Sequence, residues 1–165
     1  MRAPFGRIAL LGLLAIMLAF GQSPSDATPA KPNFSGTWRL NVQRSGPILP
    51  RGLEALTLFI HHDGPLIRSS EIRTVSGQVR KSAESDAYTD GRERVSHSKP
   101  GSIEKVKQGW SGDALLKHWE LSEEGKTYVS DIRQTLSEGG NVLVMSEHYR
   151  ESRLERIRDW VFEKQ

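Results

Sequence analysis

The stretch Asn33–Asn41, NFSGTWRLN, places Gly36 and the large ring of Trp38 two residues apart at the start of a strand-like segment. Residues two apart in a strand face the same side of the sheet. Glycine leaves room where a strand curves among crowded neighbours, and an indole beside it fills the remaining space. We therefore predict that Gly36 and Trp38 form the floor of a closed β structure, with the indole N–H bound to a carbonyl of a neighbouring strand.

Turn signals divide the chain after Phe34 at short, regular intervals, which is typical of antiparallel β domains. The segments between them alternate apolar and polar residues with the period of a strand. Strands are predicted near residues 36–42, 55–62, 66–74, 78–88, 92–98, 102–110, 114–121, 126–136, 141–150 and 153–163. Short links make sequence neighbours pair antiparallel, and closure removes the exposed edges. The predicted fold class is all-β: a single antiparallel up-and-down β-barrel of about ten strands.

Residues 1–21 have the pattern of a signal peptide, with Arg2 and Arg7 before an apolar run from Ile8 to Phe20. An uncleaved membrane anchor is the alternative, although the run is short for spanning a bilayer. Residues 22–33 are predicted to be a flexible linker and residues 34–165 the barrel domain. No Cys follows the run, so we expect a periplasmic or secreted protein without a lipid anchor or membrane insertion.

The composition of the chain excludes several classes of function. The chain has 23 Lys and Arg and 20 Asp and Glu, and residues 1–21 hold two of the arginines and no acid. The remainder carries a net charge of only +1, with the signs interspersed, so a nucleic-acid partner is not expected. The absence of Cys excludes disulfides, thiolate metal sites and Cys nucleophiles. We expect a monomer held together by burial and backbone hydrogen bonds.

The segments LIRSSEIRT and GQVRKSAESDAY carry charge on both faces. An outer-membrane barrel needs an apolar outer face, so this pattern excludes one. The pattern also predicts a lumen that is small and partly polar, or filled with side chains.

NFSGTWRLN resembles the opening strand of the calycins, the lipocalins and fatty-acid-binding proteins, whose Gly-x-Trp lies at the closed end of a ligand-holding barrel. The chain is also similar to many uncharacterised exported bacterial proteins that begin FSGTWKLN and end near VFEKQ, with turns such as LSEEGKTY and WSGDAL. The resemblance implies a barrel with a floor and a lumen for a small, partly lipophilic ligand. It also implies an Arg over the floor indole, for which the last strand offers Arg153, Arg156 and Arg158.

The chain departs from both calycin patterns. Where lipocalins have a Thr-Asp-Tyr loop motif, this chain has only Thr89-Asp90-Gly91, which is expected to lie in a hairpin turn. The first link, QRSGPILPRG, is too short for the helical pair of fatty-acid-binding proteins and is expected to act as a flap over one mouth. Their carboxylate-binding Arg-x-Tyr has its nearest analogue in Arg158-x-Trp160, which lacks the hydroxyl.

The candidate ligand-binding residues are Trp38, Tyr128, Tyr149, Arg158 and Trp160. His118 and Glu120 share a face and, with His148 on a later strand, are the metal candidates; a cross-strand hydrogen bond is the alternative. One His on the wall is also a candidate axial ligand for haem. The charged residues of the last hairpin are interpreted as structural cross-strand pairs: Glu147, Arg150, Glu151, Arg153, Glu155, Arg156, Arg158 and Asp159.

No nucleophile motif or placed carboxylate pair appears, so we do not expect an enzyme, and no cofactor is assigned. The leading hypothesis is an exported, non-enzymatic barrel protein that binds a small, partly apolar ligand in its lumen. The alternatives are a side-chain-filled barrel acting as an envelope interaction or structural module, and a haem- or metal-binding barrel.

Overall fold

The computed structural model describes residues 30–97 and 99–165 of the chain. The predicted signal peptide and residues 22–29 of the predicted linker lie outside the described residues. The strands are β1 (Gly36–Leu40), β2 (Leu53–Asp63), β3 (Leu66–Val75), β4 (Gln78–Lys81), β5 (Ser85–Tyr88), β6 (Asp90–Ser96), β7 (Ile103–Ser111), β8 (Ala114–Glu123), β9 (Lys126–Ser137), β10 (Val142–Glu151) and β11 (Leu154–Lys164). The short 3-10 helix η1 (Glu138–Gly140) joins β9 to β10.

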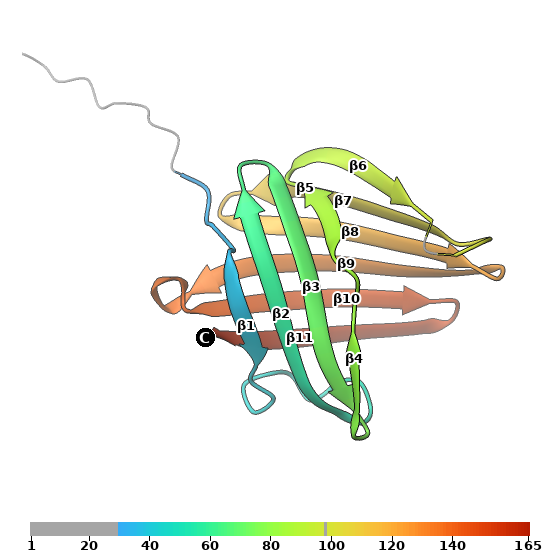
Figure 1. The fold of residues 1–165 in the computed structure, drawn as a ribbon, viewed down its shortest axis with the longest axis horizontal. Coiled ribbons are helices and arrows are strands. Elements are labelled where there is room, and N and C mark those ends of the chain that lie inside the picture. The colour runs from blue at the N-terminus through green and yellow to red at the C-terminus, as the bar shows by residue number, and fades with distance from the viewer. Residues whose placement is uncertain (1–29, 98) are drawn as a thin grey trace, which may run out of the picture. The chain divides into compact units, whose positions relative to one another are not determined.

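Every strand pairing is antiparallel, and the sheet runs in the order β4-β3-β2-β1-β11-β10-β9-β8-β7-β6, with β5 paired to β3. The sheet folds over on itself, so that β1 to β5 lie across β6 to β11 (Figure 1). The prediction of an all-β, up-and-down antiparallel barrel is confirmed. None of the helices in the described part of the chain is long and apolar enough to span a membrane.

The strand predicted for residues 78–88 is divided into β4 and β5, so the described residues form eleven strands. Both strands pair with β3, one after the other. Between them Ser82 uses its backbone N–H to bind Glu71 O at 2.9 Å, while its hydroxyl accepts the Glu71 N–H at 2.9 Å. This local arrangement replaces regular ladder pairs and ends β4.

The sheet path ends at β4 and at β6, and within residues 30–97 and 99–165 no ladder joins β5 to β6. The prediction that Thr89-Asp90-Gly91 forms a hairpin turn is therefore wrong. Thr89 is buried and donates its N–H to Pro65 O at 2.7 Å, so the chain crosses the seam between the two layers here. A hairpin would need β5 and β6 to pair with each other, whereas β5 takes β3 as its partner.

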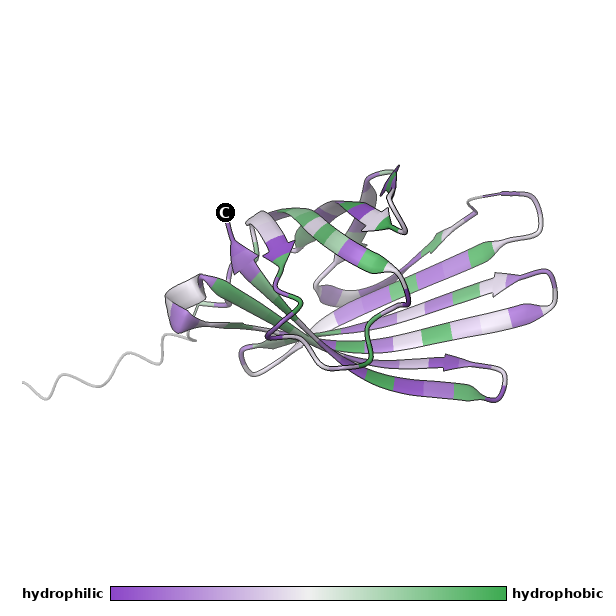
Figure 2. Ribbon diagram, turned by 90° about the horizontal axis from the view of Figure 1, so that it is seen from below, coloured by the Kyte–Doolittle hydropathy of each residue, from purple (hydrophilic) through white to green (hydrophobic). Residues whose placement is uncertain are grey.

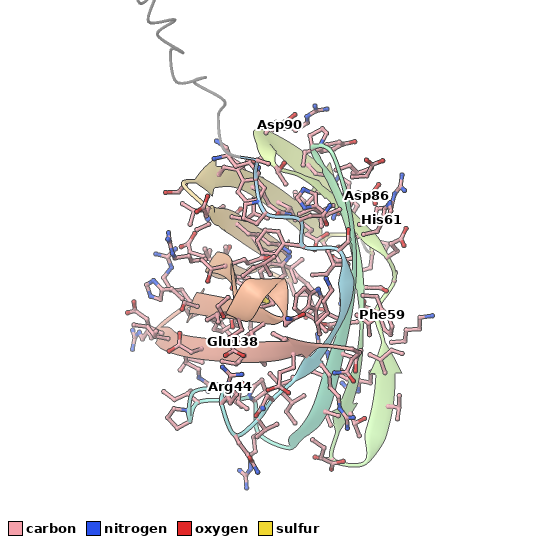
Figure 3. All side chains as sticks on the ribbon, turned by 90° about the vertical axis from the view of Figure 1, so that its left-hand side faces the viewer. Arg44, Phe59, His61, Asp86, Asp90 and Glu138 are labelled. Carbon is pink, nitrogen blue, oxygen red and sulfur yellow. The ribbon has the colours of Figure 1, made fainter. Side chains whose placement is uncertain are left out.

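The floor of the barrel holds the apolar core. Its buried members are Phe34, Trp38, Leu40, Leu56, Ile67, Leu115, Leu143, Trp160 and Phe162. They come from both layers, so the core ties the layers together where the strands cross (Figure 2). The outer face of the β1–β5 layer is solvated, and Figure 3 shows Phe59, His61 and Asp86 pointing away from the interior.

The first link, expected to be a flap, is fastened to β11. Gly46 N–H binds Asp159 O at 2.8 Å, and Ser45 Oγ accepts the N–H of Val161 at 3.0 Å. Arg44 of this link lies beside Glu138 at the end of the barrel (Figure 3), and their side chains form an ion pair at 2.5 Å. The link thus extends the pairing of β1 with β11 before the chain enters β2.

Candidate functional site

The space between the two layers contains a cavity of about 660 Å³ and an adjoining one of about 260 Å³ nearer the floor. The two share part of their walls, namely Leu58, Glu71, Arg73, Ile132 and Met145. We call this combined space the lumen. Its size is within the range of small-molecule sites in proteins.

On the inner faces of β7 to β11, directly paired residues form rows that run across the strands. The polarity of the side chains changes from one row to the next. Starting at the floor, the successive rows are Leu136–Leu143–Phe162, then Trp110–Leu115–Gln134–Met145–Trp160, then Gln108–Lys117–Ile132–Glu147–Arg158. The lumen therefore has an apolar end and a charged middle. Because side chains of a strand alternate between faces, each of these rows belongs to the interior together with the buried Leu115 and Leu143.

The lumen also has an apolar wall that can receive a hydrophobic body. Leu58 and Ile60 come from β2, Ile67 from β3, Ile132 from β9 and Met145 from β10. These side chains face the cavity from both layers, so a bound molecule would be enclosed between them.

Glu147 occupies the centre of the first polar cluster. Its carboxylate accepts a hydrogen bond from Ser130 Oγ at 2.6 Å and another from Trp160 Nε1 at 3.0 Å. Arg158 Nη1 lies 3.7 Å from the same group, and the side chains of Arg158 and Glu147 are only 11% and 13% exposed. The Arg158 guanidinium also lies against the ring of Tyr149, 5.0 Å from its centroid.

Glu104 occupies the second polar cluster, on the other side of the lumen. It accepts hydrogen bonds from Trp119 Nε1 at 2.8 Å, Ser96 Oγ at 2.7 Å and Arg94 Nη2 at 3.1 Å. Burial raises the pKa of Glu104, but the Trp119 and Ser96 hydrogen bonds and the charges of Arg94 and Lys117 outweigh burial and lower it. Glu104 is therefore ionised at neutral pH.

Lys117 on β8 lies between these two clusters. Within residues 30–97 and 99–165 its ammonium group makes no hydrogen bond and no ion pair, although part of the residue's surface reaches the cavity. Burial is the main effect on its pKa and lowers it; Glu104 and Glu147 raise it, and Arg94 lowers it further. The carboxylates are thus near enough to influence Lys117 but do not pair with it.

Glu71 and Arg73 form the third charged pair, on the β3 wall. Both line the two parts of the lumen, so the charged middle extends across to the β1–β5 layer.

Three of the five predicted ligand-binding residues come together. Tyr149, Arg158 and Trp160 are neighbours on the inner face, with Arg158 beside both rings. Tyr128 is on the inner face two rows further from the floor than Ile132, and it lines neither part of the lumen. Trp38 lies beneath the lumen in the floor, fully buried.

The floor indole is hydrogen-bonded, but its acceptor and the cation over its ring both differ from the prediction. Trp38 Nε1 donates to the carbonyl oxygen of Phe34 at 2.9 Å, within its own segment and not across to a neighbouring strand. The cation over the ring is Lys164, 5.2 Å from the centroid, so the expected Arg from the last strand is a wrong prediction. Lys164 pairs directly with Trp38 in the ladder, whereas Arg158 is three rows away and faces Glu147.

The predicted metal candidates lie on the outer face. His118 binds Asp131, with 2.6 Å between Nδ1 and Oδ1; His148 pairs with Glu155; and Glu120 lies 3.4 Å from Lys105. Across the described ranges, 30–97 and 99–165, no group of three or more His, Asp or Glu side chains is arranged to hold a metal ion. Since His118 and His148 point away from the lumen, neither is placed as an axial ligand for a haem held inside.

The sequence indicated a partly polar lumen and Arg158 as a ligand-binding residue, but it did not place Glu147 in the lumen wall. Glu147 was interpreted only as part of a cross-strand pair of the last hairpin, yet it shares parity with the core residue Leu143, and that parity was the available signal. Lys117 likewise shares parity with Leu115. Charged residues are rarely buried unless paired, so hydropathy alone points them outward.

The chain matches no protein-family model and no curated protein. Among solved structures it is similar to the crystal structure of secretory abundant heat soluble protein 4 from Ramazzottius varieornatus, with 12% sequence identity and a TM-score of 0.51. The alignment covers 82% of this chain and 96% of that chain. Membership of an exported bacterial family, expected from NFSGTWRLN and VFEKQ, stays a prediction. At this identity the likeness concerns the fold alone, and it supports a lipocalin-like antiparallel barrel at a coarse level.

Proposed function

We propose that this protein binds a small, partly apolar ligand in the lumen and catalyses no reaction. The observation that carries the proposal is the cavity of about 660 Å³, walled on both sides by apolar side chains such as Leu58, Ile67 and Met145. A side-chain-filled barrel would leave no such space. Apolar pockets with a few placed polar groups are the usual form of small-molecule sites.

We also propose that the protein is exported and acts without a lipid anchor. The support is the signal-peptide pattern of residues 1–21 and the absence of a membrane-anchoring Cys after it. N-terminal sequencing of the protein from its native host tests this part, and an intact Met1 would contradict it.

The binding proposal is tested with phenylnaphthylamine, a neutral apolar dye whose fluorescence rises when it leaves water. The purified protein should bind it saturably, at about one dye per chain. Met145→Trp places a large ring in both parts of the lumen and should weaken binding by about tenfold or more. Val95→Trp, at an exposed position on β6 of the same sheet, is the matched control and should leave binding unchanged.

Organic extraction of the protein, followed by mass spectrometry, searches for the natural ligand. A folded protein that binds no dye and yields no enriched small molecule would contradict the proposal and favour the filled barrel.

A further inference from the structure

We infer that the ligand carries an anionic group, and that Lys117 and Arg94 bind this group on the β6–β8 side of the lumen. The inference rests on the proposed function. It places the anion away from the last strand, where the resemblance to fatty-acid-binding proteins would put it.

The charges in the lumen wall are unevenly paired. The cations of the wall are Arg73, Arg94, Lys117 and Arg158, and the carboxylates are Glu71, Glu104, Glu147 and, at the exposed rim, Glu84. Each arginine is paired with one glutamate. Lys117 is the basic side chain of the wall without a counterion among the described residues. Burial lowers its pKa, and a bound anion would favour its charged form.

The carboxylates are already occupied. Both oxygens of Glu104 accept hydrogen bonds, one from Trp119 and the other from Ser96 and Arg94. Both oxygens of Glu147 also accept hydrogen bonds, from Ser130 and Trp160. Rotating Lys117 toward either carboxylate would crowd these donors, so neither carboxylate is free to serve as its counterion.

Polar atoms around Lys117 are unsatisfied. Arg94 Nε is buried with no acceptor, and so is the amide oxygen of Gln108 with no donor, within residues 30–97 and 99–165. Gln108 is only 3% exposed and pairs directly with Lys117 across the β7–β8 ladder. Buried polar atoms of this kind are uncommon in folded proteins. The Gln108 oxygen needs a donor, which Lys117 can supply, whereas Arg94 Nε needs an acceptor, which an anion can supply.

Arg94 and Lys117 contribute positive charge to the same part of the lumen wall. Both line the larger part of the lumen, and Arg94 is close enough for its charge to act on Lys117. Glu104 neutralises only one of these two cations. On this side of the lumen, Lys117 Nζ and Arg94 Nε are donors without acceptors among the described residues, and a small anion between the two side chains would supply acceptors for them.

Arg158 is a poorer anion site although its Nε is also unsatisfied. Its single positive charge is matched by Glu147 at 3.7 Å, and its guanidinium lies beside the rings of Tyr149 and Trp160. A second carboxylate at this position would face Glu147 in a poorly hydrated site, where like charges repel strongly.

The anion makes the ligand amphipathic. Its apolar body would contact the wall formed by Leu58, Ile60 and Met145, while its head reaches the charged row. A charge-assisted hydrogen bond is roughly twice as strong as a neutral one, which predicts a preference of about tenfold for the charged ligand.

Two dyes with the same ring system test the inference: anilinonaphthalene sulfonate, which is anionic, and phenylnaphthylamine, which lacks the sulfonate. We expect the purified full-length mature protein to bind the anionic dye about tenfold more tightly. Lys117→Gln should abolish this preference, measured as the ratio of the two affinities. Lys107→Gln, on the exposed face of the neighbouring strand, should keep the preference.

The ratio of the two dye affinities is measured on the unmodified protein. The inference can therefore be tested even if Lys117→Gln does not fold. Equal or tighter binding of the neutral dye would overturn the inference and keep the proposed function. A preference that survives in folded Lys117→Gln, or that is lost equally in Lys107→Gln, would also overturn it. Binding of neither dye would overturn both the inference and the proposed function.

Discussion

Trp160 Nε1 donates a hydrogen bond to Glu147 Oε2 at 3.0 Å inside the barrel. Arg158, on the same strand as Trp160, faces this carboxylate too. The Arg-x-aromatic pattern of the last strand is thus engaged by a carboxylate of the protein itself. The interior charge of Arg158 is balanced by the chain, whereas that of Lys117 is not.

Replacing Glu147 should lower the stability of the fold, because it leaves the guanidinium of Arg158 buried without a counterion. We expect Glu147→Leu to lower the free energy of unfolding by about 3–5 kcal/mol. The double variant Glu147→Leu/Arg158→Met should recover much of this loss, since it removes both charges together. Urea denaturation of the two single variants and the double variant measures the coupling.

The control for this cycle is the outer-face pair of Lys105 and Glu120, at 3.4 Å. Glu120→Leu should cost less than about 1 kcal/mol, as solvated pairs do. If Glu147→Leu costs no more than this control, the Arg158 guanidinium is reached by water and the polar interior is not sealed.

Truncating Trp38 should lower the free energy of unfolding strongly, because its side chain is fully buried in the floor. We expect Trp38→Ala to destabilise the protein by about 3–5 kcal/mol in urea melts. Phe59→Ala, at a ring that is 38% exposed on the outer face, is the aromatic control and should cost far less. A loss below about 1 kcal/mol for Trp38→Ala would show that the floor is not packed around the indole.

Gly36 is constrained by its backbone as well as by space. Its φ is 152°, and an added Cβ would lie 2.8 Å from Lys164 Cε. We expect Gly36→Ala to lower stability by about 1–3 kcal/mol, mostly from the backbone, since the end of Lys164 can move. Gly109→Ala is the matched control: Gly109 is also in a strand, an added Cβ there would meet nothing within 4 Å, and the change should be nearly neutral. Equal effects at both positions would contradict the role of Gly36 in the floor.

His62 should make stability depend on pH in the acid range. Its Nδ1 accepts the N–H of Phe34 at 3.2 Å, so the neutral ring carries its hydrogen on Nε2, which faces Gly64 O at 3.1 Å. Burial lowers the pKa of His62 below its usual 6.5, opposed by the hydrogen bond to Gly64 and the charge of Asp63. The other charged groups at this end are Lys31 and Asp90.

Because the native pKa of His62 is lowered, the unfolded chain binds more protons as the pH falls below 6.5. The stabilisation is complete above that pH and is lost as the pH falls toward the native pKa. Urea melts at several pH values should show this loss in the natural protein and a smaller one in His62→Gln. An NMR titration in which the His62 ring protonates at or above pH 6.5 would contradict the prediction.

The strands and their order were accessible from the sequence, because period-two alternation and glycine turns are local signals. The segments 126–136 and 141–150 each match a strand to within a residue or two. Gly36 and Trp38 indicated the floor for the same reason, since a glycine and an indole on one face have few other uses in a strand.

Other features depended on which strands meet. The division of 78–88 comes from Ser82 binding Glu71, and the cation over Trp38 is Lys164 because β11 pairs with β1. Neither partner is near in sequence.

The sequence by itself determined an all-β chain with a glycine–tryptophan floor, because backbone geometry and side-chain alternation act over a few residues. Only the tertiary structure decided that Lys117 and Glu147 face inward and that Lys117 is the cation lacking a counterion there among the described residues. Hydropathy predicts that charged residues lie at the surface. Their burial is stable only when partners from other strands compensate their charge, and those partners are set by the tertiary structure.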